Sequence, residues 1–308
     1  MTAGELELLG TNIDDSFFII GVAVLSFELF KGVRKKTIGK RSLLDMFASV
    51  STQLAYIIVE IFVLSFAYLG YVYLSNTYVS WSFPINVWTI IAAVLACDFV
   101  YYWEHRFSHQ IRVLWTQHAV HHSSRFMNIT VATRFGPFEG LFSTLAHLPL
   151  VFVGFPPELL FFGVVVVLAY QTWIHTESIK RLGALDGWLN TPSNHRVHHG
   201  CNEKYLDKNY GGIFIFWDRL FGTYQREEET PRYGLKRDFH SVNPFVVWFS
   251  ELPGLAGDLV RSRSLYEVWM RLFAHPAWQP PQKSLRANAG VDGSPLKPSL
   301  IAPTLKGR

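Results

Sequence analysis

Two long apolar runs, residues 54–74 and 85–103, constrain the fold of this chain more than any other feature. Each is long enough to cross a bilayer, for which a helix needs about 20 apolar residues. Three shorter apolar runs lie at residues 17–30, 141–153 and 159–174. Only 17% of the residues are charged, against about 25% in soluble domains. We therefore expect an all-α integral membrane fold with four to five apolar helices.

The last two runs are joined by the turn Gly154-Phe155-Pro156-Pro157. Two short apolar segments joined by a Gly/Pro turn indicate a helical hairpin. We predict that this hairpin enters the membrane from the side on which its two ends lie. The sequence leaves open whether the hairpin crosses the bilayer completely.

The loops between the runs differ sharply in charge. The loop after the first run carries six basic residues before any acid: Lys31, Arg34, Lys35, Lys36, Lys40 and Arg41. The loop at residues 75–84 carries no charge. Basic loops face the cytoplasm, so we expect a multi-pass protein whose later polar segments form a cytoplasmic cap. The membrane would be a bacterial inner membrane, or the endoplasmic reticulum in a eukaryote.

The rest of the chain adds no second domain. We expect residues 1–275 to form a single membrane-embedded domain, and the Pro/Gly/Ser-rich residues 276–308 to form a disordered basic tail. A net charge of +4, without a Lys/Arg run interleaved with aromatic residues, gives no support for nucleic-acid binding. Cys97 and Cys201 lie far apart and form no CxxC pair, so they predict neither a disulfide framework nor a thiolate zinc site.

Nine of the twelve histidines fall in clusters at helical spacing. The clusters are His105 with His109, then His118, His121 and His122, then His195, His198 and His199, and His175 follows the hairpin. Residues three and four apart on a helix are neighbours, so each cluster presents its imidazoles to one side. Nine imidazoles exceed the needs of one ion, and we predict two metal ions with four or five imidazoles each. Isolated histidines such as His147 are expected to be ordinary polar residues.

The ligand type alone does not select the metal, because imidazole suits zinc, copper, iron and nickel alike. A two-metal site where apolar helices emerge from the membrane indicates chemistry on a lipid tail. Iron can activate dioxygen, whereas zinc has no redox chemistry.

A membrane transporter or metal-handling protein is the alternative from another class. Transporters place ionisable groups near the bilayer midplane in repeated halves, whereas here the histidines follow the spans and no repeat is visible.

Five segments carry a family resemblance: Asp98-Phe-Val-Tyr-Tyr-Trp-Glu-His105 with His109, His118-Ala-Val-His-His-Ser-Ser, Trp173-Ile-His-Thr176, Asn190-Thr-Pro-Ser-Asn-His-Arg-Val-His-His-Gly200, and the stretch from Lys208-Asn-Tyr-Gly-Gly to Tyr224. Together they resemble the fatty acid hydroxylase/sterol desaturase superfamily of integral-membrane non-haem di-iron enzymes over residues 96–224. The chain looks most like the alkylglycerol monooxygenase-like bacterial members. The resemblance implies that the nine clustered histidines are iron ligands.

The resemblance also implies a reaction and its cofactors. The expected reaction is dioxygen-dependent hydroxylation of an unactivated C–H bond in a lipid or sterol, with desaturation at the same site as the alternative. It implies two iron ions (Fe2+/Fe3+) and dioxygen as co-substrate. The chain has neither a GxGxxG motif nor a His-Pro-Gly-Gly haem segment, so an external redox carrier is expected. Pterin is a further cofactor of the alkylglycerol monooxygenase-like branch, but Gln110 replaces the acidic residue that follows its HxxxH pair, which counts against pterin.

Four residues are candidates to orient the ligand imidazoles by a hydrogen bond to the ring nitrogen that does not bind the metal. Asp98 lies seven residues before His105 in an otherwise apolar run, and we predict that it accepts a hydrogen bond from a ligand imidazole. An ion pair with Arg106 or Arg134 is the alternative for Asp98. Gln171 stands where many fatty acid hydroxylases have a further histidine. Asn209 and Asp218 complete the set of candidates.

Overall fold

The structure, a computed structural model, describes residues 1–280. The predicted tail, residues 276–308, lies outside the described residues from position 281 onward. The described helices are α1 (Ala3–Arg34), α2 (Lys40–Tyr78), α3 (Val87–Gln110), α4 (Arg112–His122), η1 (Ile129–Thr133), α5 (Glu139–His147), α6 (Pro149–Val153), α7 (Pro157–Gln171), η2 (Thr172–Ile174), η3 (Gly183–Gly187), α8 (Pro192–His198), α9 (Phe216–Leu220), α10 (Pro244–Trp248), α11 (Leu252–Val260) and α12 (Leu265–Phe273). Over residues 1–280 the only β-structure is two isolated bridges, so the predicted all-α fold is confirmed.

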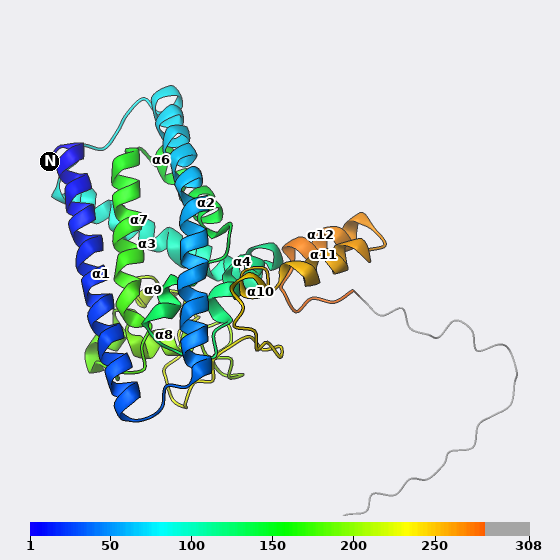
Figure 1. The fold of residues 1–308 in the computed structure, drawn as a ribbon. Coiled ribbons are helices and arrows are strands. Elements are labelled where there is room, and N and C mark those ends of the chain that lie inside the picture. The colour runs from blue at the N-terminus through cyan, green and yellow to red at the C-terminus, as the bar shows by residue number, and fades with distance from the viewer. Residues whose placement is uncertain (281–308) are drawn as a thin grey trace, which may run out of the picture. The chain divides into compact units, whose positions relative to one another are not determined.

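Four segments of the described chain are long and apolar enough to cross a membrane: α1, α2, α3 and the Pro157–Ile174 segment made of α7 and η2 (Figure 1). The apolar run at residues 17–30 is shorter than the 32-residue helix it belongs to. Polar residues extend that helix toward its N-terminus, where Thr2 and Glu5 form a capping box, and the Thr11 and Ser16 hydroxyls point back to carbonyls four residues earlier. Reading the apolar run alone therefore underestimated the length of α1.

The first arm of the predicted hairpin is interrupted. α5 ends at His147 and α6 begins at Pro149, whose ring removes a backbone N–H. Gly154 then adopts a φ of 102°, in the left-handed region that glycine tolerates, and α7 begins with Pro157 at its first turn. The segment Glu139–Val153 falls below the length of the four candidate spans, whereas the second arm reaches it.

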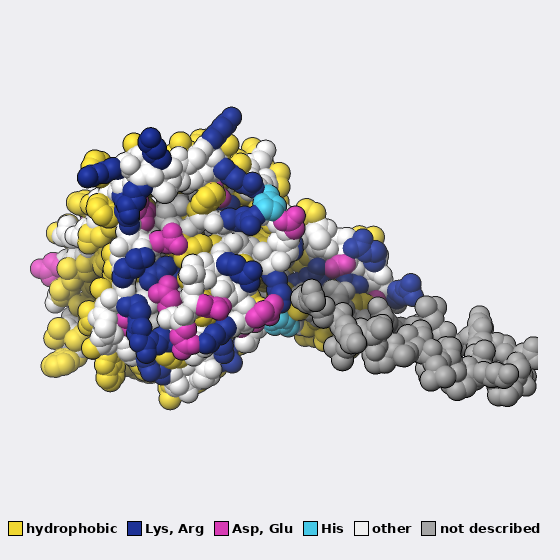
Figure 2. Space-filling view, turned by 90° about the horizontal axis from the view of Figure 1, so that it is seen from below, with side chains coloured by type: hydrophobic (Ala, Val, Ile, Leu, Met, Phe, Trp, Pro, Cys, Tyr) yellow, Lys and Arg dark blue, Asp and Glu magenta, His cyan; other side chains and the backbone are white. Residues whose placement is uncertain are grey.

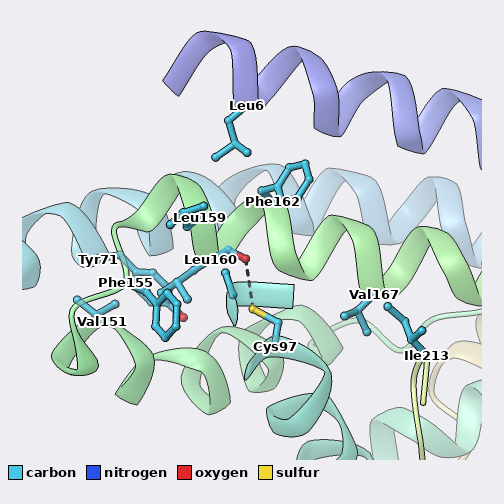
Figure 3. Packing of buried hydrophobic residues seen from close by; sticks show 11 residues of the cluster. Leu6, Tyr71, Cys97, Val151, Phe155, Leu159, Leu160, Phe162, Val167 and Ile213 are labelled. Atoms are coloured by element: carbon cyan, nitrogen blue, oxygen red, sulfur yellow. Dashed lines mark hydrogen bonds between the residues drawn. The ribbon is translucent and has the colours of Figure 1, made fainter. Parts of the chain in front are cut away.

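The apolar core lies where α7 packs against α3 and α1 (Figure 3). Leu160 and Val167 of α7 are buried against α3, and the Cys97 thiol lies 3.7 Å from the Leu160 carbonyl. A Cβ on Gly163 would lie 2.7 Å from the Cys97 sulfur. Glycine at this position therefore lets the two helices approach closely.

The loop between α1 and α2 lies at the same end of the molecule as the histidines. The Lys31 ammonium donates to the Ser178 hydroxyl at 3.4 Å, and the Arg41 guanidinium donates to the His240 carbonyl at 2.7 Å. Figure 2 views this end, where basic and acidic side chains gather on the face and hydrophobic side chains surround it. The basic loop and the segments that follow the histidine-bearing helices thus share one polar end.

Candidate metal centre

Four elements bring the nine clustered histidines together. α3 carries His105 and His109 in its last two turns, α4 carries His118, His121 and His122, and α8 with its C-cap carries His195, His198 and His199. His175 follows η2 at the end of the hairpin. All nine side chains are buried, and each pair or triplet lies on a helix as its spacing predicts.

Within the described residues, the imidazoles form two groups that could each hold a metal ion. The five-histidine group consists of His105, His109, His118, His122 and His198, and the four-histidine group consists of His121, His175, His195 and His199. In each group the ligating nitrogens lie within 4.8 Å of one another. Each HxxHH motif is therefore divided: its two members four residues apart join one group and the middle histidine joins the other.

The ring nitrogens of the first group converge at their Nε2 atoms. The Nε2 of His118 lies 3.0 Å from that of His105 and 3.2 Å from that of His122. The Nε2 atoms of His109 and His198 are buried without a hydrogen-bond partner.

The second group converges in the same way. The Nε2 of His175 lies 3.1 Å from that of His121 and 2.8 Å from that of His195, and the latter lies 3.0 Å from the Nε2 of His199. Both groups therefore gather several Nε2 atoms at one point.

The opposite ring nitrogens determine the protonation of these imidazoles. The Nδ1 atoms of His105, His121, His175 and His198 face the backbone carbonyls of Tyr210, Arg134, Gln171 and Lys208 at 2.8–3.3 Å. A carbonyl only accepts, so Nδ1 carries the proton and Nε2 presents a lone pair. Lone pairs facing each other at about 3 Å repel unless a cation lies between them, and this donor set therefore fits a metal ion.

Burial keeps these rings neutral. The pKa values of His121, His122, His195, His198 and His199 lie well below the usual histidine value because removal from water penalises the charged imidazolium. Neighbouring imidazoles lower them further by mutual repulsion. A neutral imidazole is the form that ligates a metal.

Asp98 does not act as predicted. Its buried carboxylate accepts hydrogen bonds from the backbone N–H groups of Ile213 and Phe214 at 2.6 and 3.3 Å and from the Trp217 indole at 2.8 Å. In the described chain these are its hydrogen-bond partners, and they include neither an imidazole nor an arginine, so both interpretations of Asp98 were wrong. Asp98 precedes His105 by seven residues, which correspond to about 10 Å along a helix. Its carboxylate therefore lies away from the imidazoles and beside the segment that leads into α9.

Over residues 1–280, the side chains of the other three candidates, Gln171, Asn209 and Asp218, form no hydrogen bond to an imidazole either. The Gln171 side chain accepts from the Tyr101 hydroxyl at 2.8 Å and donates to the Val167 carbonyl at 3.1 Å. Its carbonyl, rather than its side chain, receives the His175 Nδ1–H at 2.8 Å. The Gln171 side chain thus contacts α3 and α7 instead of an imidazole.

Asp218 and Asn209 hold the loop whose carbonyls face two imidazoles. The Asp218 carboxylate accepts from the N–H groups of Tyr210 and Gly211 at 2.7 and 2.8 Å. The Asn209 amide donates to the Asn194 carbonyl at 3.0 Å and to the Gln225 carbonyl at 2.8 Å. Both residues thus support the carbonyls of residues 208 and 210 and contact no imidazole themselves.

Sequence reasoning missed Glu139, a carboxylate within hydrogen-bond distance of a clustered imidazole. Glu139 begins α5, and its Oε1 lies 2.7 Å from the Nδ1 of His118. Its other oxygen accepts from the N–H of Gly136 at 3.1 Å. Glu139 is the only acidic residue between Glu104 and Glu158, and that isolation was the available signal.

Two buried ion pairs fix the surroundings of the histidines. The Arg134 guanidinium lies 3.0 Å from the Asp45 carboxylate of α2 and donates to the Val120 carbonyl, while its own carbonyl faces His121. Arg196, between the histidines of α8, pairs with Glu227 at 2.7 Å and donates to the Thr176 carbonyl at 2.9 Å. These pairs tie α8 and η1 to the remaining histidine-bearing segments.

A cavity of about 430 Å³ opens beside the five-histidine group. Its lining includes the buried His109, His122, His198 and His199 and the less buried Arg112 and residues 275–277. The Trp115 ring also lines the cavity, with its centroid 5.2 Å from that of His109. The cavity gives a route from the surface to the imidazoles.

Comparison with known proteins identifies the family. Residues 90–223 match the model of the fatty acid hydroxylase family, a range that contains all nine clustered histidines. The chain belongs to the fatty acid hydroxylase/sterol desaturase superfamily.

Three relatives illustrate the range of this superfamily. Alkylglycerol monooxygenase of Homo sapiens is 35% identical over 237 residues, which are 77% of this chain and 53% of that protein. The Danio rerio alkylglycerol monooxygenase is 42% identical over 183 residues, 59% of this chain and 40% of that protein. Ornithine lipid hydroxylase OlsE of Rhizobium tropici is 33% identical over 143 residues, 46% of this chain and 43% of that protein. The chain spans about half the length, or less, of these superfamily relatives. No solved structure matches.

Proposed function

We propose that this superfamily member is a membrane lipid hydroxylase that holds two iron ions, one in each histidine group. The observation that carries the proposal is the convergence of buried, neutral imidazoles into two adjacent groups with their Nε2 lone pairs facing inward. Two iron ions would supply the redox chemistry that activates dioxygen for insertion into a C–H bond. Relatives named as a monooxygenase and a lipid hydroxylase support this assignment.

The chain's own residues would hold, orient and shield this chemistry. The carbonyls of residues 134, 171, 208 and 210 and the Glu139 carboxylate keep the Nδ1 protons turned away from the ligating nitrogens. Burial of all nine rings limits the contact of water with the reacting region to the cavity. The cavity beside His109 would admit a substrate of limited cross-section to the five-histidine group.

We propose a lipid or sterol in the bilayer as the substrate. Four segments are long and apolar enough to cross a membrane, and their polar end contains the histidines. The six basic residues of the α1–α2 loop lie at that end, so we assign the histidine end to the cytoplasmic side. Electrons would come from an external redox carrier, and dioxygen would be the co-substrate.

Metal analysis combined with lipid profiling tests this proposal. The protein is purified anaerobically, its iron content is measured, and lipids are compared between cells with and without the gene. We expect two iron ions per chain and a lipid that gains one oxygen atom. A lipid that loses two hydrogens would instead assign a desaturase.

A matched pair of variants sharpens the experiment. His121→Ala removes one histidine of the four-histidine group, whereas His240→Ala removes an exposed histidine outside both groups. Iron and lipid conversion should fall in the first variant and stay unchanged in the second. Normal lipid conversion by His121→Ala protein that lacks iron would refute the proposal.

A further inference from the structure

The helices α11 and α12 are inverted in polarity compared with helices on the surface of a soluble domain. Several of their apolar side chains face outward: Val260 and Leu265 are each 87% exposed and Trp269 is 61% exposed, whereas Leu255 of α11 is buried. Arg271, on the same helix as Trp269, is only 7% exposed. In water this arrangement would expose a contiguous apolar surface and bury a charge, both of which are unfavourable.

The buried charges fasten this pair of helices to the candidate metal centre. The Asp258 carboxylate of α11 lies 2.5 Å from the guanidinium of Arg112 at the start of α4 and 3.1 Å from that of Arg271. α4 carries three of the clustered histidines, and Arg112 lines the cavity. Asp258 and Arg271 therefore face the protein, while Val260, Leu265 and Trp269 are left for another environment.

The exposed apolar surface continues onto a helix of membrane-spanning length. α10 packs its buried Val247 against Ala48 and Val120, while the neighbouring Phe245 is 74% exposed. On α2, Phe47 beside Ala48 is also exposed. Figure 1 shows α11 and α12 running across, rather than along, the direction of α1, α2 and α7. The surface is therefore oriented to lie along a membrane instead of crossing it.

Charge and residue type point to the same environment. Arg261 and Arg263, in the turn between α11 and α12, are exposed, and Trp269 and Tyr266 lie on the outward side. Basic residues attract anionic headgroups, and tryptophan and tyrosine are enriched at membrane interfaces.

We propose that residues 244–273, comprising α10, α11 and α12, form an in-plane anchor that inserts its apolar side into the lipid leaflet at the histidine end. Residues 275–277, directly after α12, line the cavity that leads to His109 and His198. The anchor thus holds the mouth of this cavity at the lipid surface. A lipid chain reaches the five-histidine group from the leaflet without crossing bulk water. This second consequence rests on the proposed function, whereas the anchor does not.

Depth-dependent fluorescence quenching tests the anchor. The full chain with Cys201→Ser leaves the buried Cys97 as its only cysteine. Single cysteines at Leu265 or Trp269, and at the exposed Glu203 as control, are labelled with an environment-sensitive dye in nanodiscs that hold one chain. We expect lipids with a shallow spin label to quench positions 265 and 269 at least several-fold more than position 203. Soluble iodide should give the opposite order.

Each other outcome overturns the anchor. Equal iodide quenching at all three positions would mean that the surface faces water. Shielding from both quenchers in one-chain discs would mean that it packs against the chain itself. Shielding that appears only with two chains per disc would assign the surface to a dimer. The result does not depend on iron or on turnover, so failure of the anchor and failure of the proposed function are distinguishable.

Discussion

The core between α3 and α7 and the histidine end of the same helices are both buried, yet they are stabilised by different chemistry. In the core, Leu160, Val167 and Cys97 pack without side-chain charges, and a glycine allows the close approach of the helices. At the histidine end, rings and charges are buried, and most of the Nδ1 hydrogen bonds go to a backbone carbonyl or, for His118, to a carboxylate. Substitutions should therefore affect packing in the first region and hydrogen bonding, charge and metal retention in the second.

The largest effect is expected from removing one histidine of each group. His109→Ala and His199→Ala take one ring from the five- and the four-histidine group. We expect each to lose iron and to abolish lipid conversion, because the remaining rings no longer complete the ligand set. Iron per chain and lipid turnover measure this. Full iron content in both variants would contradict the assignment of the two groups.

A smaller effect, on stability, is expected from the buried pair beside His121. Asp45→Asn leaves the Arg134 charge without its partner, which costs about 3–5 kcal/mol in buried pairs. Thermal unfolding in detergent measures the loss. The double variant Asp45→Asn with Arg134→Gln should recover part of it, since no uncompensated charge remains. Equal loss in the single and double variants would mean that the charge itself is not responsible.

The apolar core should respond to volume alone. Leu160→Ala removes a fully buried side chain from α7, and we expect a loss of about 2–5 kcal/mol with the iron content of the folded protein unchanged. Leu145→Ala, on the exposed side of α5, is the matched control and should cost less. Loss of iron at intact stability in Leu160→Ala would show that the two regions are not separable.

The smallest effect is expected at Glu139. Glu139→Gln keeps the shape of the side chain but weakens its hydrogen bond to the Nδ1 of His118, and we expect iron affinity to fall by roughly 10–100-fold. Competition with a chelator measures this. Glu158→Gln, which changes the next acid of the sequence at the far end of the hairpin, is the control. Unchanged affinity in Glu139→Gln would assign Glu139 a role in anchoring α5 only.

Much of this architecture is predictable because it rests on local patterns. Long apolar runs specify helices, and the i, i+3 and i+4 spacing of histidine specifies which rings share a helix face. Prediction failed where a residue's partner is distant in sequence. Asp98 forms hydrogen bonds with residues 213, 214 and 217, and Glu139 with His118. No helical or strand periodicity in the sequence links residues that far apart. The outward apolar side of α12 was also missed, because spacing alone does not tell which face of an amphipathic helix meets the protein.

The sequence by itself determined that the chain is helical, that it carries helices of membrane-spanning length, and that nine histidines lie on a few helix faces. Only the tertiary structure decided how those histidines divide. His118 and His122 join His105, His109 and His198, whereas His121 joins His175, His195 and His199. Four residues turn a helix by little more than one full revolution, so i and i+4 share a direction and the residue between them points aside. The crossing of α3, α4 and α8 decides which histidines of α4 and α8 point into each group. That crossing depends on packing between residues far apart in the chain.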